Sequence, residues 1–160
     1  MAWNISIMCV KASKQEIDEI IPDVLYKSEE NLFFEDVTSY KMEKAMGITE
    51  LNGWIIITDV VNRVTHNEEF PLNVSKSFEV KTFYISENPI FRAYSEGKPT
   101  ESVKGIEEFK TLLNSRNIEP KDAYGETKSI QLFEYEILNG LNNGWGEHLF
   151  RAKFDKYELD

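Results

Sequence analysis

The dipeptide Asn52-Gly53 stands between two apolar segments and restricts the fold more tightly than any other local feature of the chain. Asparagine followed by glycine readily adopts the two positive φ angles of a type I′ turn, which joins antiparallel strands. The pattern predicts a hairpin whose first strand covers residues 46–51 and whose second covers residues 54–61. The second strand is apolar enough on both faces to lie in the middle of a sheet.

Alternation of apolar and polar residues predicts further strands near both ends of the chain and in its centre. The central ones are rich in β-branched and aromatic residues and are separated by turns that contain Pro89 and Gly97. Besides the hairpin, strands are predicted at residues 3–10, 80–86, 90–95, 100–103 and 150–155.

Helices are predicted where apolar residues recur at helical spacing. Ser13 and Glu16 have the spacing of a capping box, so a helix begins at Ser13, and Pro22 ends or kinks it near Ile21. Other helices are predicted at residues 71–77, 106–114 and 130–141, whereas residues 62–69 are expected to form a polar loop. These elements indicate a single α+β domain over residues 1–160, with a mainly antiparallel sheet and helices packed on one face.

The chain of 160 residues carries a formal charge of −10, and this charge is concentrated near the N-terminus. The stretch from Glu16 to Asp36 contains eight acidic residues and only one basic residue, Lys27, so its formal charge is −7. Such a field repels phosphate backbones and anionic membrane surfaces, so neither nucleic acid nor a membrane is an expected partner. It attracts a basic protein. In the alternative interpretation, these acids are only the solvated side of a helix and a loop.

A bulky apolar segment, residues 32–34, lies inside this acidic stretch. Partly exposed aromatic rings within an acidic rim suit a basic protein partner. The predicted partner-binding residues are therefore Glu29, Glu30, Phe33, Phe34, Glu35 and Asp36. Alternatively, Phe33 or Phe34 belongs to the core.

A second hypothesis is a small enzyme or ligand-binding protein with a pocket that uses both histidines as acid or base. His66 precedes two carboxylates, and Trp145 lies between two glycines shortly before the second histidine. The alternative pocket residues are His66, Trp145, Glu147 and His148. The competing interpretation is a loop histidine beside acids and a helix-to-strand turn in which Trp145 covers the core.

Catalytic and cofactor motifs do not stand out in the sequence. Neither histidine has a second histidine at helical or strand spacing, so no metal site is expected. There is no nucleophile elbow, phosphate loop or dinucleotide fingerprint, and we expect no cofactor. The single cysteine, Cys9, lies in a predicted strand, where burial makes a thiol unreactive. The N-terminal residues lack the pattern of a signal peptide, so a cytoplasmic location is expected.

Three segments together carry a resemblance to a known class of proteins. They are residues 52–57 (NGWIII), 80–84 (VKTFY) and 91–98 (FRAYSEGK). Their rhythm of strands and turns resembles small, acidic, uncharacterised bacterial proteins of the toxin-immunity-like kind. The resemblance implies a scaffold with a binding role, because many immunity proteins are small and acidic and neutralise a toxin by covering it. It implies no site residue.

The sequence thus favours a binding protein over an enzyme. The first hypothesis is an immunity-type inhibitor that occludes a basic partner, and the second is the enzyme or ligand binder with the histidine pocket. A structural or oligomeric component is the third possibility, which a large apolar face would indicate.

Overall fold

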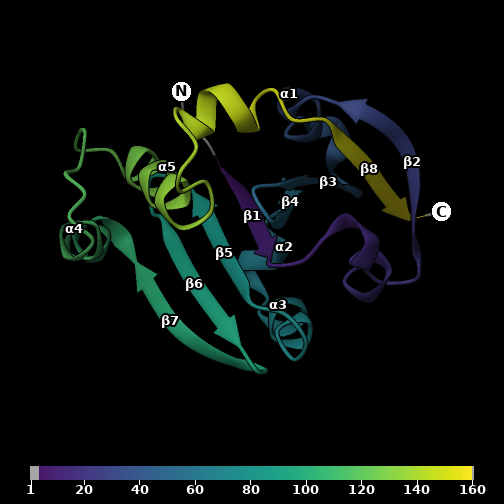
Figure 1. The fold of residues 1–160 in the computed structure, drawn as a ribbon, viewed down its shortest axis with the longest axis horizontal. Helices are drawn as coiled ribbons and strands as arrows, with labels where there is room; N and C mark the ends of the chain where they lie inside the picture. The colour runs from purple at the N-terminus through teal and green to yellow at the C-terminus, as the bar shows by residue number, and fades with distance from the viewer. Residues whose placement is uncertain (1–3, 160) are drawn as a thin grey trace.

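The strands form one antiparallel sheet in the order β2-β8-β3-β4-β1-β5-β6-β7 (Figure 1). The computed structural model describes residues 4–159, apart from the side chain of Tyr40. The strands are β1 (Ile5–Val10), β2 (Leu25–Leu32), β3 (Ala45–Leu51), β4 (Trp54–Asp59), β5 (Val80–Ile85), β6 (Ile90–Ser95), β7 (Lys98–Lys104) and β8 (Phe154–Leu159).

Helical segments connect most of these strands. They are η1 (Lys14–Glu19), α1 (Phe34–Val37), η2 (Tyr40–Met42), α2 (Arg63–His66), α3 (Glu69–Val74), α4 (Gly105–Ser115), α5 (Gly125–Glu136) and η3 (Gly144–Leu149). Only α4 and α5 are longer than two turns. The chain therefore forms one domain of the α+β class, as the sequence predicts.

The hairpin predicted from Asn52-Gly53 is confirmed, and it joins β3 to β4. Asn52 and Gly53 have φ angles of 55° and 84°, and Leu51 is paired with Trp54 across the turn. The Asn52 side-chain amide donates a hydrogen bond of 2.8 Å to the carbonyl oxygen of Ile137, just beyond α5. The turn therefore positions the hairpin and also fixes it to the helical layer.

Both faces of the sheet are covered, because β1 buries every one of its side chains. Ile7 and Cys9 point into a cluster with residues from α4, α5, η3 and α1, and we call this side the long-helix face. Met8 and Val10 point the opposite way, toward residues from α2, α3 and the end of η1, and we call this side the short-helix face. The prediction of helices on one face holds for α4 and α5, which lie on the same side of the sheet, but not for α2 and α3.

An aromatic group fills the long-helix face near β8. The Trp145 ring contacts those of Phe34 and Phe133, with centroids 5.5 Å apart in each pair. Phe150 and Phe154 also contact Phe34, at 5.0 Å and 6.1 Å between centroids. These rings come from α1, α5, η3, β8 and the residue after η3, so one aromatic core joins segments that are far apart in the sequence.

An ion-pair network ties β5 to the C-terminal ends of α4 and α5. One Glu136 carboxylate oxygen lies 2.7 Å from the ammonium of Lys81, and the other lies 2.7 Å from the guanidinium of Arg116. The Glu136 side chain is only 9% exposed, so it is a largely buried acid between two cations. Removing its charge would leave both cations without their closest partner.

Most predicted elements are found, although α5 begins and ends about five residues before the helix predicted at residues 130–141. The hairpin strands, the central strands and the edge strand are present, although the edge strand β7 begins at Lys98 and includes Pro99, which was expected in the preceding turn. The segment after Ser13 is a 3₁₀ helix, with the Glu16 carboxylate accepting a hydrogen bond of 3.1 Å from the Ser13 backbone N–H. The predicted first strand begins at Ile5, and Trp3 lies outside the described residues.

Three predictions are wrong. Residues 25–32 form a strand, β2, where the sequence indicated the exposed side of a helix and a loop. The closing strand begins at Phe154 and not at Phe150, because residues 144–149 adopt π-helical turns and bury Trp145. The expected polar loop at residues 62–69 contains α2, which buries Val64 and Thr65 against the short-helix face.

Candidate functional site

The acidic stretch lies at one end of the sheet, where β2 is the outermost strand (Figure 1). All residues from Tyr26 to Glu30 are exposed, so β2 faces solvent on both of its sides. Its only strand neighbour among the described residues is β8, with two shifts in register between Lys27 and Leu32. The predicted binding residues at the end of β2 and in α1 therefore share an open edge of the fold.

Basic residues neutralise part of this acidic charge. Glu30 forms an ion pair of 2.7 Å with Lys27, and Glu29 lies 3.6 Å from Lys156 of β8. The hydrogen bond and charge of Glu30 raise the pKa of Lys27. The Lys156 ammonium also pairs with Glu158 at 3.1 Å and lowers the pKa of that carboxyl. Glu29 and Glu30 of β2 are thus exposed, and their ion pairs are of the solvated kind that contributes little stability.

Glu35 and Asp36 lie in the first turn of α1. Both side chains are exposed. The Asp36 carboxylate accepts a hydrogen bond of 2.9 Å from the Phe33 backbone N–H, so it stabilises the start of this turn. Asp36 therefore has a structural role that Glu35 does not share in the described contacts.

The two phenylalanines of the predicted patch have different environments. Phe33 is 45% exposed, and the ammonium of Lys153 lies 3.6 Å from its ring centroid. Phe34 is fully buried and belongs to the aromatic core described above. Phe33 is available for a partner, whereas Phe34 is not, which matches the alternative in which one of the two rings belongs to the core.

The structure adds apolar residues that the sequence did not indicate. Val24, Tyr26 and Leu159 are 67%, 44% and 53% exposed, and all three lie beside or within the paired strands β2 and β8. With Phe33 they make four of the seven large hydrophobic side chains that are exposed among the described residues. We call the exposed set the β2 surface; it consists of Val24, Tyr26, Glu29, Glu30, Phe33, Glu35, Asp36 and Leu159.

His66 lies on the short-helix face. Its ring contacts the ring of Tyr84 edge-on, with centroids 5.0 Å apart, and its Nδ1 lies 3.0 Å from the Thr65 hydroxyl. That hydroxyl is also hydrogen-bonded to Ser6 of β1. Ser6 and Thr65 are both buried, so this group of polar side chains holds α2 against the sheet.

Trp145, Glu147 and His148 belong to η3 on the long-helix face. Trp145 is 8% exposed, and its backbone N–H donates a hydrogen bond of 3.2 Å to the Glu134 carboxylate. Glu147 is exposed and pairs with Arg151 at 3.4 Å. Since the sheet separates Trp145 from His66, the structure does not bring the four residues of the proposed histidine pocket together.

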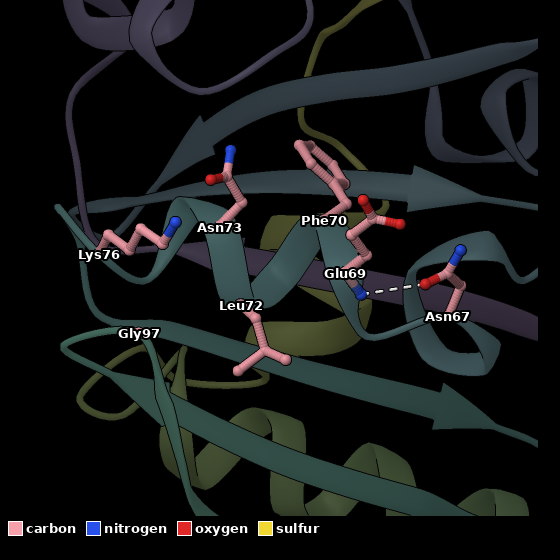
Figure 2. Close-up of a pocket in the computed structure, with 7 residues that line it drawn as sticks. All are labelled: Asn67, Glu69, Phe70, Leu72, Asn73, Lys76 and Gly97. Carbon is pink, nitrogen blue, oxygen red and sulfur yellow. Dashed lines mark hydrogen bonds between the residues drawn. The ribbon is translucent and has the colours of Figure 1, made fainter.

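A cavity lies beside α3. It has a volume of about 510 Å³ and is lined by residues of α3 and its surroundings, together with Gly97 of the β6–β7 turn. Figure 2 shows Phe70 and Asn73 projecting to one side of α3, whereas Leu72 projects to the other. The side chains do not converge on a point, and none of the predicted site residues lines this cavity.

Two features that would suggest a function are absent from residues 4–159. Within residues 4–159, no three His, Cys, Asp or Glu side chains are grouped so that they could hold a metal ion. No helix in the same range is long and apolar enough to span a bilayer. Comparison with protein-family models, with curated proteins and with solved structures gave no match.

Proposed function

We propose that this protein is a cytoplasmic protein-binding module that covers a basic partner with its β2 surface, in the manner of an immunity-type inhibitor. One observation carries the proposal. Most of the exposed large hydrophobic residues lie at the sheet edge that also carries the acidic stretch. Exposed apolar side chains next to charged ones offer a protein partner both hydrophobic contacts and charge complementarity.

The mechanism follows from the two kinds of residue on the β2 surface. The net negative charge steers a basic partner toward the edge of the sheet. Such charge complementarity raises the association rate more than the final affinity. Phe33, Val24 and Leu159 then lose exposed area to the partner, which supplies the non-directional part of the binding free energy. Inhibition is by occlusion, so it needs no reactive group on this chain.

The resemblance to small, acidic, toxin-immunity-like bacterial proteins supports the same role. Many proteins of this class work by covering their target. A domain with an exposed edge strand can do so without a deep cavity. In this proposal the partner is a basic protein, and its positive charges replace Lys27 and Lys156 as the partners of Glu30 and Glu29.

Capture from the host by crosslinking tests this function. The informative variant is Glu29→Gln/Glu30→Gln/Glu35→Gln, with Asp36 kept because it caps α1. The matched control, Glu96→Gln/Glu107→Gln/Glu119→Gln, removes the same charge from exposed residues elsewhere. We expect the wild type and the control each to capture one basic protein in a one-to-one ratio. The first variant should capture much less of that protein. Equal capture by all three proteins would refute the role of the β2 surface.

A further inference from the structure

Over residues 27–32, the outer edge of β2 has no backbone partner among the described residues. β2 ends the sheet, and β8 is its only strand partner among the described residues (Figure 1). None of the turn, loop or cap hydrogen bonds between described backbone groups uses residues 27–32. Every second residue of an edge strand directs its N–H and C=O away from the sheet, so this edge is a template for one more strand.

The opposite edge of the sheet is less suited to this role. β7 contains Pro99, which lacks a backbone donor, and α4 begins directly after it at Gly105. β2 contains no proline over its eight residues. Of the two ends of the sheet, β2 is therefore the one with a complete set of backbone donors.

The side chains of β2 restrict which strand can pair with it. Charged residues on an edge normally prevent pairing, because like charges repel and charged side chains resist burial. Glu29 and Glu30 lie in the middle of the edge, and apolar Val24 and Phe33 flank its two ends. An acidic strand is repelled by this arrangement, whereas lysine or arginine side chains opposite the two glutamates are attracted.

From these observations, and resting on the function proposed above, we propose that the basic partner contributes an extended strand that pairs with the outer edge of β2. Backbone hydrogen bonds to residues 27–32 supply affinity, and the two glutamates select basic side chains. The two register shifts in β2 limit the regular ladder to a few residues. Charge and the flanking apolar contacts must therefore contribute to a stable complex.

The test uses the full-length ¹⁵N-labelled protein and a defined probe, a blocked eight-residue peptide of alternating lysine and valine. At low salt we expect this peptide to slow amide hydrogen exchange at alternate residues of 27–32 by about 10-fold or more. A peptide of the same sequence with alternate backbone amides methylated, and one with glutamate in place of lysine, should leave exchange there unchanged. The variant Glu29→Gln/Glu30→Gln should bind the first peptide more weakly than Glu107→Gln/Glu119→Gln.

Several results would overturn strand addition. These are equal binding of the methylated peptide, no protection of β2 amides by the lysine-valine peptide, or protection in the free protein through pairing of two copies of this chain. A different result would refute the proposed function itself: capture of a basic protein from the host would not depend on the acids of β2. A captured partner that requires those acids but leaves β2 amides unprotected refutes only the strand addition.

Discussion

The adjacent residues Phe33 and Phe34 give the sharpest test of which side chains are core and which are available to a partner. The structure buries Phe34 completely and leaves Phe33 45% exposed. Replacing Phe34 by alanine removes a ring that contacts those of Trp145 and Phe150 at 5.5 Å and 5.0 Å. Phenylalanine-to-alanine changes in a core cost about 3–5 kcal/mol, because transfer free energy is lost and a cavity remains.

For a domain of this size each kcal/mol lowers the melting temperature by about 2–4 °C, so Phe34→Ala should melt about 6–20 °C lower. Phe33→Ala loses a cation–π contact with Lys153 and little buried area, which together are worth about 1 kcal/mol or less. Urea unfolding followed by tryptophan fluorescence gives both free energies of unfolding. A loss in Phe34→Ala no larger than that in Phe33→Ala would refute the placement of the two rings.

Three further perturbations follow from the packing, ion pairs and burial described above. A Cβ at Gly47 would overlap the Val37 side chain and the Thr58 hydroxyl, so Gly47→Ala should lower the free energy of unfolding by about 1–3 kcal/mol or more. Gly146 has open space around it, so Gly146→Ala should leave the free energy of unfolding unchanged. Glu136→Gln should lower the free energy of unfolding by about 2–4 kcal/mol, because two largely buried cations lose their anion. Glu107→Gln, at an exposed ion pair, should change it by less than about 0.5 kcal/mol in the same urea titration. Burial raises the pKa of the Cys9 thiol well above its ordinary value, so a thiol reagent at pH 8 should label the protein only in denaturant; rapid labelling of the folded protein would contradict this.

The parts of the fold that depend on local chemistry could be predicted from the sequence. Asn52-Gly53 determines its turn through its own backbone preferences, and Ser13 with Glu16 forms its cap within one turn. Both signals lie within a few residues. The central strands were also recognisable, because they are buried and therefore rich in β-branched and aromatic residues.

The elements that were mispredicted depend on contacts between distant parts of the chain. β2 shows no apolar alternation, since both its sides face solvent, and only pairing with β8 makes it a strand. The alternation of Phe150 with Phe154 indicates a strand, but Phe150 packs against Phe34 and Trp145 after a π-helical segment. A local pattern cannot reveal which of several apolar side chains joins an aromatic core assembled from five segments.

The candidate site was predictable in its charge and only partly in its residues. The concentration of acids was evident from the sequence, and all of these acids except Glu16 are exposed. Phe34 is buried by rings more than a hundred positions away in the sequence. Val24, Tyr26 and Leu159 join the same surface because β2 pairs with β8, which is equally distant in the sequence. The histidine pocket was suggested by residue types alone, and the sheet lies between its members.

The association rate constant of the captured partner tests the central claim most directly. It should be measured by stopped-flow fluorescence at low and at physiological salt for the wild type, Glu29→Gln/Glu30→Gln/Glu35→Gln and the control Glu96→Gln/Glu107→Gln/Glu119→Gln. We predict association about 10-fold slower for the first variant at low salt, a difference that shrinks as salt screens the charges, and little change for the control beyond the effect of total charge. Equal rates for the two variants at low salt would contradict docking at the β2 surface.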